Sequence, residues 1–264
     1  MTERIHDLFN LDGKVAVVTG GSRGIGEMIA EGFVDAGASV IITARKTEEL
    51  ENTAARLRDK GLGSVTAISG DMGTVEGVQR FAEEVAAIAP KLDVLVNNAG
   101  ASWGASLGDF PQSGWDKVMN VNVRGVYYLT EALVDQLRAA GTEDDPARVI
   151  NIGSVDGLRA CDLEHYAYSA SKAAVHHLTR QLAKRLRLEN VRVNAIAPGP
   201  FESKMMAFAL ATDELREAVA ADVPVGRIGT PDDIAGAAIF LASRAGAYLT
   251  GTVIPVGGGI ATAD

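Results

Sequence analysis

Short apolar runs alternate with helical patterns along most of the chain. Each run is continuous and rich in β-branched residues, which is typical of a strand buried on both faces of a sheet. Between the runs, apolar residues recur at spacings of three and four, as on one face of an amphipathic helix. The pattern predicts strands at residues 15–20, 39–44, 64–69, 93–96, 148–152, 191–197 and 252–256.

The segments between these strands are predicted to be crossover helices. They cover residues 25–36, 50–60, 75–88, 115–140, 166–188 and 231–243, whereas residues 200–224 follow a less regular pattern. Seven strands with such connections imply an α/β fold, a doubly wound parallel sheet of Rossmann type with helices on both faces. Because we find no linker, repeat or low-complexity segment, we expect residues 1–264 to form a single domain.

Composition narrows the class of protein. The chain has 264 residues, of which 47% are hydrophobic and 22% charged, so it has enough apolar surface to fold. Its 34 acidic and 25 basic residues give a net charge of −9, which disfavours nucleic acid and anionic membranes as partners. The polar start MTERIHDLFNLDGK lacks the apolar core of a signal peptide, and no run is long enough for a membrane helix. We therefore expect a cytoplasmic protein.

Cysteine and histidine usage gives no metal motif. Cys161 is the single cysteine, so an intrachain disulfide is excluded and we expect no cysteine-based zinc site. His165, His176 and His177 lie near or in the predicted helix 166–188, without the spacing of a catalytic triad or a metal site. We expect solvated positions for these histidines and no bound metal.

A glycine-rich turn follows the first predicted strand. Its sequence, Thr19 to Gly26 (TGGSRGIG), lies directly before a predicted helix. Glycines let the backbone approach a pyrophosphate, and the helix N-terminus supplies free N–H groups and partial positive charge. A turn that serves only strand-to-helix packing is the alternative. The order of strand, turn and helix favours a dinucleotide site formed by Gly20, Ser22, Arg23, Gly24, Ile25 and Gly26.

A tyrosine and a lysine lie four residues apart on the predicted helix 166–188. This spacing places Tyr168 and Lys172 on one face. A free tyrosine has a pKa near 10, and a neighbouring ammonium would lower that pKa and make the phenol a better acid or base. Tyr166 has Ala170 at the corresponding position and lacks such a partner. Ser154, at the end of strand 148–152, could hydrogen-bond a substrate carbonyl, although it could also be an ordinary turn serine.

The combined motifs resemble the short-chain dehydrogenase/reductase family over essentially the whole chain. The turn has TGxxxGxG spacing, Asn97-Asn98-Ala99-Gly100 follows the fourth strand, and Pro198-Gly199 follows the sixth. Asn122, Ser154, Tyr168 and Lys172 occur in the order of the family. Within it, the stretches ASWGAS, VINIGSV and GAYLTGTVIPVGGG are similar to NADPH-dependent 3-oxoacyl (β-ketoacyl) reductases of the rhamnolipid-synthesis type.

The resemblance implies a role for each of these residues. Tyr168 would donate a proton to the developing alkoxide, Ser154 would stabilise it, and Lys172 would tune Tyr168 and hold the ribose. Asn122, favoured over Asn120 by family register, would hold a water that links the lysine to solvent. Further contacts with the cofactor would come from Asp71, Met72, Asn98, Ala99, Gly100, Tyr168, Lys172, Pro198, Gly199, Phe201 and Ser203.

The end of the second strand indicates which nicotinamide cofactor binds. NAD sites usually place an acidic residue there to bind the ribose 2′-hydroxyl. This chain instead has Thr43-Ala44-Arg45-Lys46, and Arg23 lies in the glycine turn. Because arginine pairs well with a 2′-phosphate, we expect NADP(H) rather than NAD(H). A solvated helix start is the alternative interpretation of Arg45 and Lys46.

The predicted activity is the NADPH-dependent reduction of a ketone, a 3-oxoacyl thioester by resemblance, to a secondary alcohol. An apolar lid at about residues 200–224 would close over the substrate, although helix packing or subunit contact explains that segment equally well. The enzymatic alternative is a dehydrogenase or reductase of another alcohol or ketone of sugar, steroid or polyketide type. A non-catalytic NADP(H)-binding regulator is the alternative of another class. Related proteins imply a homotetramer, with residues 260–264 as a subunit-facing tail.

Overall fold

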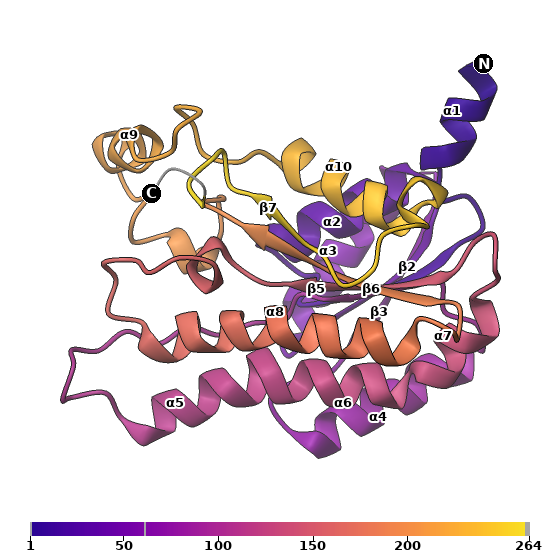
Figure 1. The fold of residues 1–264 in the computed structure, drawn as a ribbon, viewed down its shortest axis with the longest axis horizontal. Helices are drawn as coiled ribbons and strands as arrows, with labels where there is room; N and C mark the ends of the chain where they lie inside the picture. Colours follow the sequence, from indigo (N-terminus) through magenta and orange to yellow (C-terminus); the bar gives the residue numbers. More distant parts are fainter. Residues whose placement is uncertain (1, 61, 262–264) are drawn as a thin grey trace.

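A parallel seven-stranded sheet forms the centre of the molecule (Figure 1). The computed structural model describes residues 2–60 and 62–261. The order β3-β2-β1-β4-β5-β6-β7 and the all-parallel pairing confirm the predicted doubly wound α/β fold. The strands are β1 (Val15–Thr19), β2 (Ser39–Ala44), β3 (Ser64–Ser69), β4 (Val94–Asn97), β5 (Ala147–Ile152), β6 (Val191–Pro198) and β7 (Val253–Val256).

Helices cover both faces of this sheet. One face carries α2 (Gly24–Asp35), α3 (Thr47–Arg58) and α10 (Pro231–Ala242), whose apolar residues join one core cluster. The other face carries α4 (Val75–Ile88), α6 (Gly125–Ala132) and α8 (Tyr166–Leu186), which bury a second cluster. The strands lie between two apolar layers, which explains why their sequences are continuously hydrophobic.

Three segments differ from the sequence prediction. The expected helix 115–140 is divided into α5 (Gln112–Met119), a π-helical turn η1 (Asn120–Arg124), α6 and α7 (Val134–Ala140). The irregular segment 200–224 contains the short turn η3 (Lys204–Met206) and the helix α9 (Asp213–Ala221), which Thr212 caps. The polar start forms a helix, α1 (Thr2–Phe9), that the apolar pattern did not predict. The divided helix keeps Leu129, Leu133 and Leu137 in the core, whereas α9 has no buried residue, so an apolar pattern marks the former and not the latter.

The strand order reverses between β1 and β4, and their carboxyl ends lie next to each other. Ligands of doubly wound sheets bind at this point. The glycine turn after β1, the segment after β4 and the turn after β5 all open at this edge. In the part of the chain that the structure describes, we find no helix with the length and apolarity to cross a membrane.

Candidate active site

The glycine turn has a backbone conformation that requires small residues. Gly20 and Gly24 lie in the left-handed region, with φ of +65° and +55°. A Cβ atom on Gly26 would lie 2.3 Å from both the Gly20 carbonyl oxygen and Asn98 Nδ2. Arg23 precedes α2 in extended conformation and gives no side-chain cap to its first N–H groups. These amides are therefore suited to a phosphate, which fits the dinucleotide site that the turn predicts.

Asn98 and Thr19 hold the turn against the end of β4. The Thr19 hydroxyl accepts hydrogen bonds from the backbone N–H groups of Asn98 and Ala99, both at 2.9 Å. The Asn98 amide donates to the Thr19 carbonyl at 2.8 Å and to the Gly20 carbonyl at 3.2 Å. Asn98, predicted to contact the cofactor, therefore has a second function, because it fixes the shape of the turn.

Ser22 and Arg23, of which Arg23 is predicted to bind a 2′-phosphate, both contact the carboxylate of Glu49. The Ser22 hydroxyl donates to Glu49 at 3.0 Å, and Arg23 Nη1 contacts both carboxylate oxygens of Glu49 at 3.0 and 3.3 Å. Arg45 is exposed and has no ion pair with another described residue. Ser22 and Arg23 together form a place for an anion, where the Glu49 carboxylate lies in this structure.

The hydroxyl groups of Ser154 and Tyr168 form the centre of the candidate catalytic site. Ser154 follows β5 and begins the short turn η2 (Val155–Gly157), where its Oγ accepts a hydrogen bond from the Asp156 N–H at 3.1 Å. Burial raises the pKa of Tyr168 to about 12, and the neighbouring Ser154 side chain opposes this rise in part. The prediction that the neighbouring lysine lowers this pKa is wrong for this structure, because desolvation of the phenolate has the larger effect.

Lys172 is buried beneath the tyrosine ring. Its Nζ donates to the Ile152 carbonyl at 2.8 Å and lies 5.4 Å from the centre of the Tyr168 ring. Burial lowers the pKa of Lys172 to about 8. The predicted pair therefore forms, but the ammonium contacts the face of the ring and a carbonyl at the end of β5, which is why it does not counter the burial of the hydroxyl.

Asn122 occupies the π-helical turn and is almost fully buried. Its side chain accepts from the Ala101 N–H at 2.8 Å and donates to the Ala101 carbonyl and to Ser171 Oγ, both at 2.9 Å. Both amide hydrogens are thus used within the protein, and only acceptor capacity on Oδ1 remains for a water. The structure shows Asn122 joining the segment after β4 to α8; its water relay stays a prediction.

The remaining predicted cofactor residues lie around the same edge. Asp71 accepts from the Gly73 N–H at 2.9 Å, and the Met72 side chain is buried in the core. Gly199 donates to Val256 at 3.0 Å and so joins the end of β6 to β7. Gly100, Pro198 and Ile25 keep their predicted positions beside the edge, at the ends of β4 and β6 and in the first turn of α2.

In the segment after β6, Ser203 lies beside the glycine turn, whereas Phe201 is buried in the core. The Ser203 side chain lies 3.2 Å from a Cβ built on Gly24, so this segment reaches the glycine turn. Phe201 is 2% exposed, and its ring packs over Gly229. The Phe201 ring therefore belongs to the core and does not contribute to a mobile lid, while its predicted contact with the cofactor stays a prediction.

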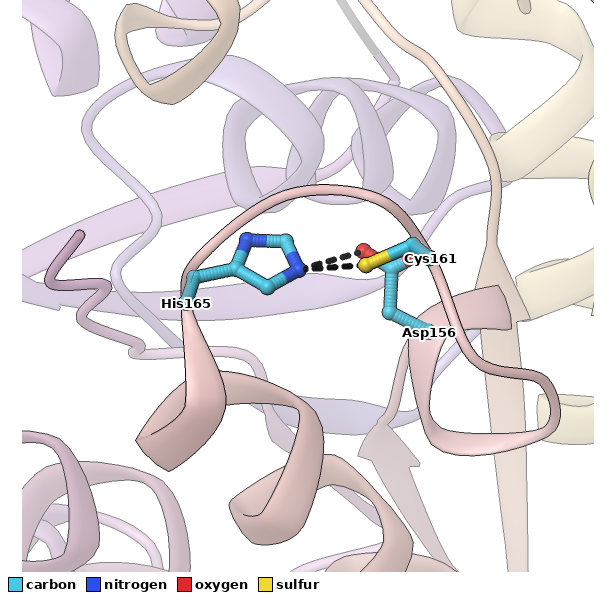
Figure 2. Close-up of side chains that lie close together, drawn as sticks. All are labelled: Asp156, Cys161 and His165. Carbon is cyan, nitrogen blue, oxygen red and sulfur yellow. Dashed lines mark hydrogen bonds and ion pairs between the residues drawn. The ribbon is translucent and has the colours of Figure 1, made fainter. Parts of the chain in front are cut away.

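Sequence reasoning missed a cluster beside Tyr168. Asp156, Cys161 and His165 come from η2, the following loop and the residue before α8, and they converge in Figure 2. His165 is partly buried against Tyr168, with ring centres 5.1 Å apart, and His176 is buried, so only His177 has the expected exposure. The four-residue spacing of Cys161 and His165 was the available signal, but Asp156 joins them only through the fold.

Comparisons with known proteins assign the chain to a class. The family model described as Enoyl-(Acyl carrier protein) reductase matches residues 20–261. Together with the site, this match shows that the chain belongs to the short-chain dehydrogenase/reductase family of oxidoreductases, as the motifs predicted.

Three relatives cover nearly the whole chain. The rhamnolipids biosynthesis 3-oxoacyl-acyl-carrier-protein reductase of Pseudomonas aeruginosa is 48% identical over 255 residues, covering 97% of this chain and 99% of that protein. The structure of the Pseudomonas aeruginosa RhlG/NADP active-site complex superposes with a TM-score of 0.94 at 48% identity, with coverage of 97% and 99%. Galactitol 2-dehydrogenase of Rhizobium johnstonii is 36% identical over 258 residues, covering 95% and 96%.

Proposed function

We propose that this oxidoreductase reduces a 3-oxoacyl thioester to the 3-hydroxyacyl thioester with NADPH. The observation that carries the proposal is the proximity of the Ser154 and Tyr168 side chains at the ligand-binding edge, with Lys172 buried beneath the phenol ring. The 48% identity to a 3-oxoacyl-acyl-carrier-protein reductase, over nearly the full length of both chains, supports the substrate class.

The side chains of this pair supply the acid for carbonyl reduction. When bound, the dihydronicotinamide supplies a hydride for the carbonyl carbon. Tyr168 donates its proton to the carbonyl oxygen, and Ser154 holds that oxygen by a hydrogen bond. The raised pKa of Tyr168 keeps the proton on the phenol at neutral pH, so the acid is ready before the reaction. Lys172 and Asn122 lie on the route by which a proton returns to Tyr168 from solvent.

We propose NADP(H) as the cofactor in preference to NAD(H). The uncapped N-terminus of α2 would hold the pyrophosphate, and Ser22, Arg23 and Arg45 would hold the 2′-phosphate. The similarity to RhlG, whose structure is described as an NADP active-site complex, supports this choice. Equal or better efficiency with NADH in steady-state kinetics would contradict it.

We propose that residues 200–224 form the substrate lid. A groove of about 720 Å³ runs between the first turns of α2 and this segment, and Leu210, Ser203 and Gly24 line part of it. Phe208 and Met205 are exposed on the same segment. Exposed apolar side chains on this segment would suit an acyl chain.

A polyol or sugar substrate is the second candidate, supported by the 36% identity to galactitol 2-dehydrogenase. A non-catalytic regulator is the less favoured class, because both Tyr168 and Lys172 are retained. The deciding experiment measures NADPH absorbance with a panel of acetoacetyl thioesters, diketones, sugars and steroids. We expect the fastest loss with the thioesters. Faster turnover of a sugar would reject the thioester, and no turnover of any carbonyl would favour the regulator.

We also propose a cytoplasmic homotetramer. Figure 1 shows α5 and α8 side by side. Trp115 of α5 and Tyr127 and Tyr128 of α6 are exposed. The strand β7 forms an edge of the sheet and has unpaired backbone groups on one side. The predicted tail starts at Ile260, and its residues 262–264 lie outside the described residues. Light scattering that gives the mass of a monomer would contradict this assembly.

A further inference from the structure

The loop between β5 and α8 brings three potential metal ligands to one point. Cys161 Sγ lies 2.9 Å from His165 Nε2, and Asp156 Oδ2 lies 3.5 Å from the same nitrogen. The three donor atoms all lie within 4.8 Å of one another (Figure 2). All three residues are partly buried, so the protein shields their donor atoms without closing them off from solvent.

The geometry distinguishes a metal site from a nucleophilic triad. In a triad the nucleophile and the carboxylate bind opposite nitrogens of the imidazole, so the carboxylate can orient the base. Here the thiol and the carboxylate both approach Nε2. One ring nitrogen cannot serve both groups in that way, whereas a cation placed between the three atoms can bind all of them.

The distances also suit a small soft cation. Zn²⁺ bond lengths of about 2.3 Å to sulfur and about 2.0 Å to nitrogen and oxygen, at tetrahedral angles, separate neighbouring ligands by roughly 3.3–3.6 Å. The 3.5 Å between His165 and Asp156 matches this range, and the 2.9 Å between Cys161 and His165 must widen by about half an ångström. The connecting loop, residues 158–164, contains neither helix nor strand that resists this shift.

We propose that Asp156, Cys161 and His165 bind a thiophilic divalent cation such as Zn²⁺, which leaves one coordination position open and excludes substrate from Tyr168. His165 packs against the Tyr168 ring, and the Asp156 N–H donates to Ser154, so the ion lies beside the groups that would hold the carbonyl. Three protein ligands with an open fourth position are typical of accessible zinc sites. The inhibitory part rests on the proposed reductase function, whereas the binding part does not.

The first test measures binding without any substrate. We expect metal-free full-length protein to bind one equivalent of Co²⁺, giving the visible bands of a tetrahedral site and a thiolate-to-metal band in the near ultraviolet, and Zn²⁺ to displace it. Cys161→Ser should remove the thiolate band, and His165→Gln should weaken binding at least roughly tenfold. The exposed neighbours supply matched controls, Asp162→Asn and His177→Gln, which should bind as the wild type does.

A second measurement remains valid if a variant fails to fold. Cys161 is the single cysteine, so alkylation by iodoacetamide reports on this thiol alone. Zn²⁺ should slow alkylation of the wild-type protein at least tenfold. Absence of the thiolate band, or equal alkylation with and without Zn²⁺, would overturn the site.

The kinetic arm separates the two parts of the proposal. Zn²⁺ should inhibit competitively against the ketone, and His165→Gln should relieve the inhibition. Binding without competition would reject the exclusion of substrate. Binding by a protein that reduces none of the carbonyls would reject the reductase proposal and leave the metal site standing.

Discussion

The glycine turn and the catalytic group meet at one edge of the sheet but are built differently. The turn is held by backbone atoms and small residues, with Asn98 and Thr19 hydrogen-bonded to each other. The catalytic group is built from side chains, and the buried ammonium of Lys172 donates to the Ile152 carbonyl beneath the Tyr168 ring. The shape of the glycine turn is encoded in the spacing of its residues. The chemistry of the catalytic group depends on the burial of its side chains, which residue spacing does not reveal.

Tyr168→Phe should produce the largest effect and tests the catalytic half. Loss of the proton donor should lower kcat by about 10²–10⁴-fold. NADPH affinity, measured by fluorescence titration, should change little, because the ring and Lys172 remain. A variant that retains the wild-type rate would remove Tyr168 from the mechanism.

Gly26→Ala tests how strongly the backbone of the glycine turn is constrained. The new methyl group would lie 2.3 Å from a backbone carbonyl and from Asn98, so we expect overpacking to lower the free energy of unfolding by about 2–3 kcal/mol and to weaken NADPH binding. Gly236→Ala, in α10, is the matched control, because its methyl group meets no atom within 4 Å. It should stabilise the protein by up to about 1 kcal/mol. Equal urea midpoints for the two variants would show that the turn is less constrained than its geometry indicates.

His176 tests whether burial shifts the pKa of a further group near the catalytic residues. Burial lowers the pKa of His176 to about 4, and the charged groups Lys172 and Arg180 lower it further. As the pH falls below about 6.5, His176 of the unfolded chain binds a proton, whereas His176 of the folded protein stays neutral. The contribution of His176 to the free energy of unfolding is therefore fully present above that pH and is lost as the pH falls toward 4. The loss attributable to His176 is on the order of 2 kcal/mol by about pH 5.

The measurement is urea unfolding at about pH 7 and about pH 5. His176→Gln should reduce the loss of stability between the two pH values, whatever its absolute stability. His177→Gln, which changes the exposed neighbour, should keep the wild-type loss. If both variants behave like the wild type, the acid sensitivity has another source.

Glu49→Gln should produce the smallest effect and sharpens the cofactor assignment. Removing this carboxylate frees Ser22 and Arg23 for a 2′-phosphate, so NADPH should bind roughly two- to fivefold tighter while NADH changes little. Arg45→Ala should weaken NADPH binding roughly tenfold. Isothermal titration with both cofactors measures these changes, and equal shifts for NADH would contradict a phosphate site.

The sequence predicted the sheet well because buried parallel strands leave an unambiguous apolar signal. All seven strands lie within about a residue of their predicted bounds. The positions of Asn122, Ser154 and Lys172 at the ligand edge also followed from motif order. The raised pKa of Tyr168, the buried ring of Phe201 and the neighbours of Cys161 did not, because each depends on residues brought together by distant segments.

The π-helical turn at Asn120–Arg124 makes the length of its segment as important as its composition. A wide turn holds one residue more than an ordinary one, and each residue advances a helix by about 100°. Shortening this stretch by a single position would restore a regular helix and rotate one flank against the other. Asn122 could then no longer reach both Ala101 and Ser171, although every active-site side chain would still be encoded.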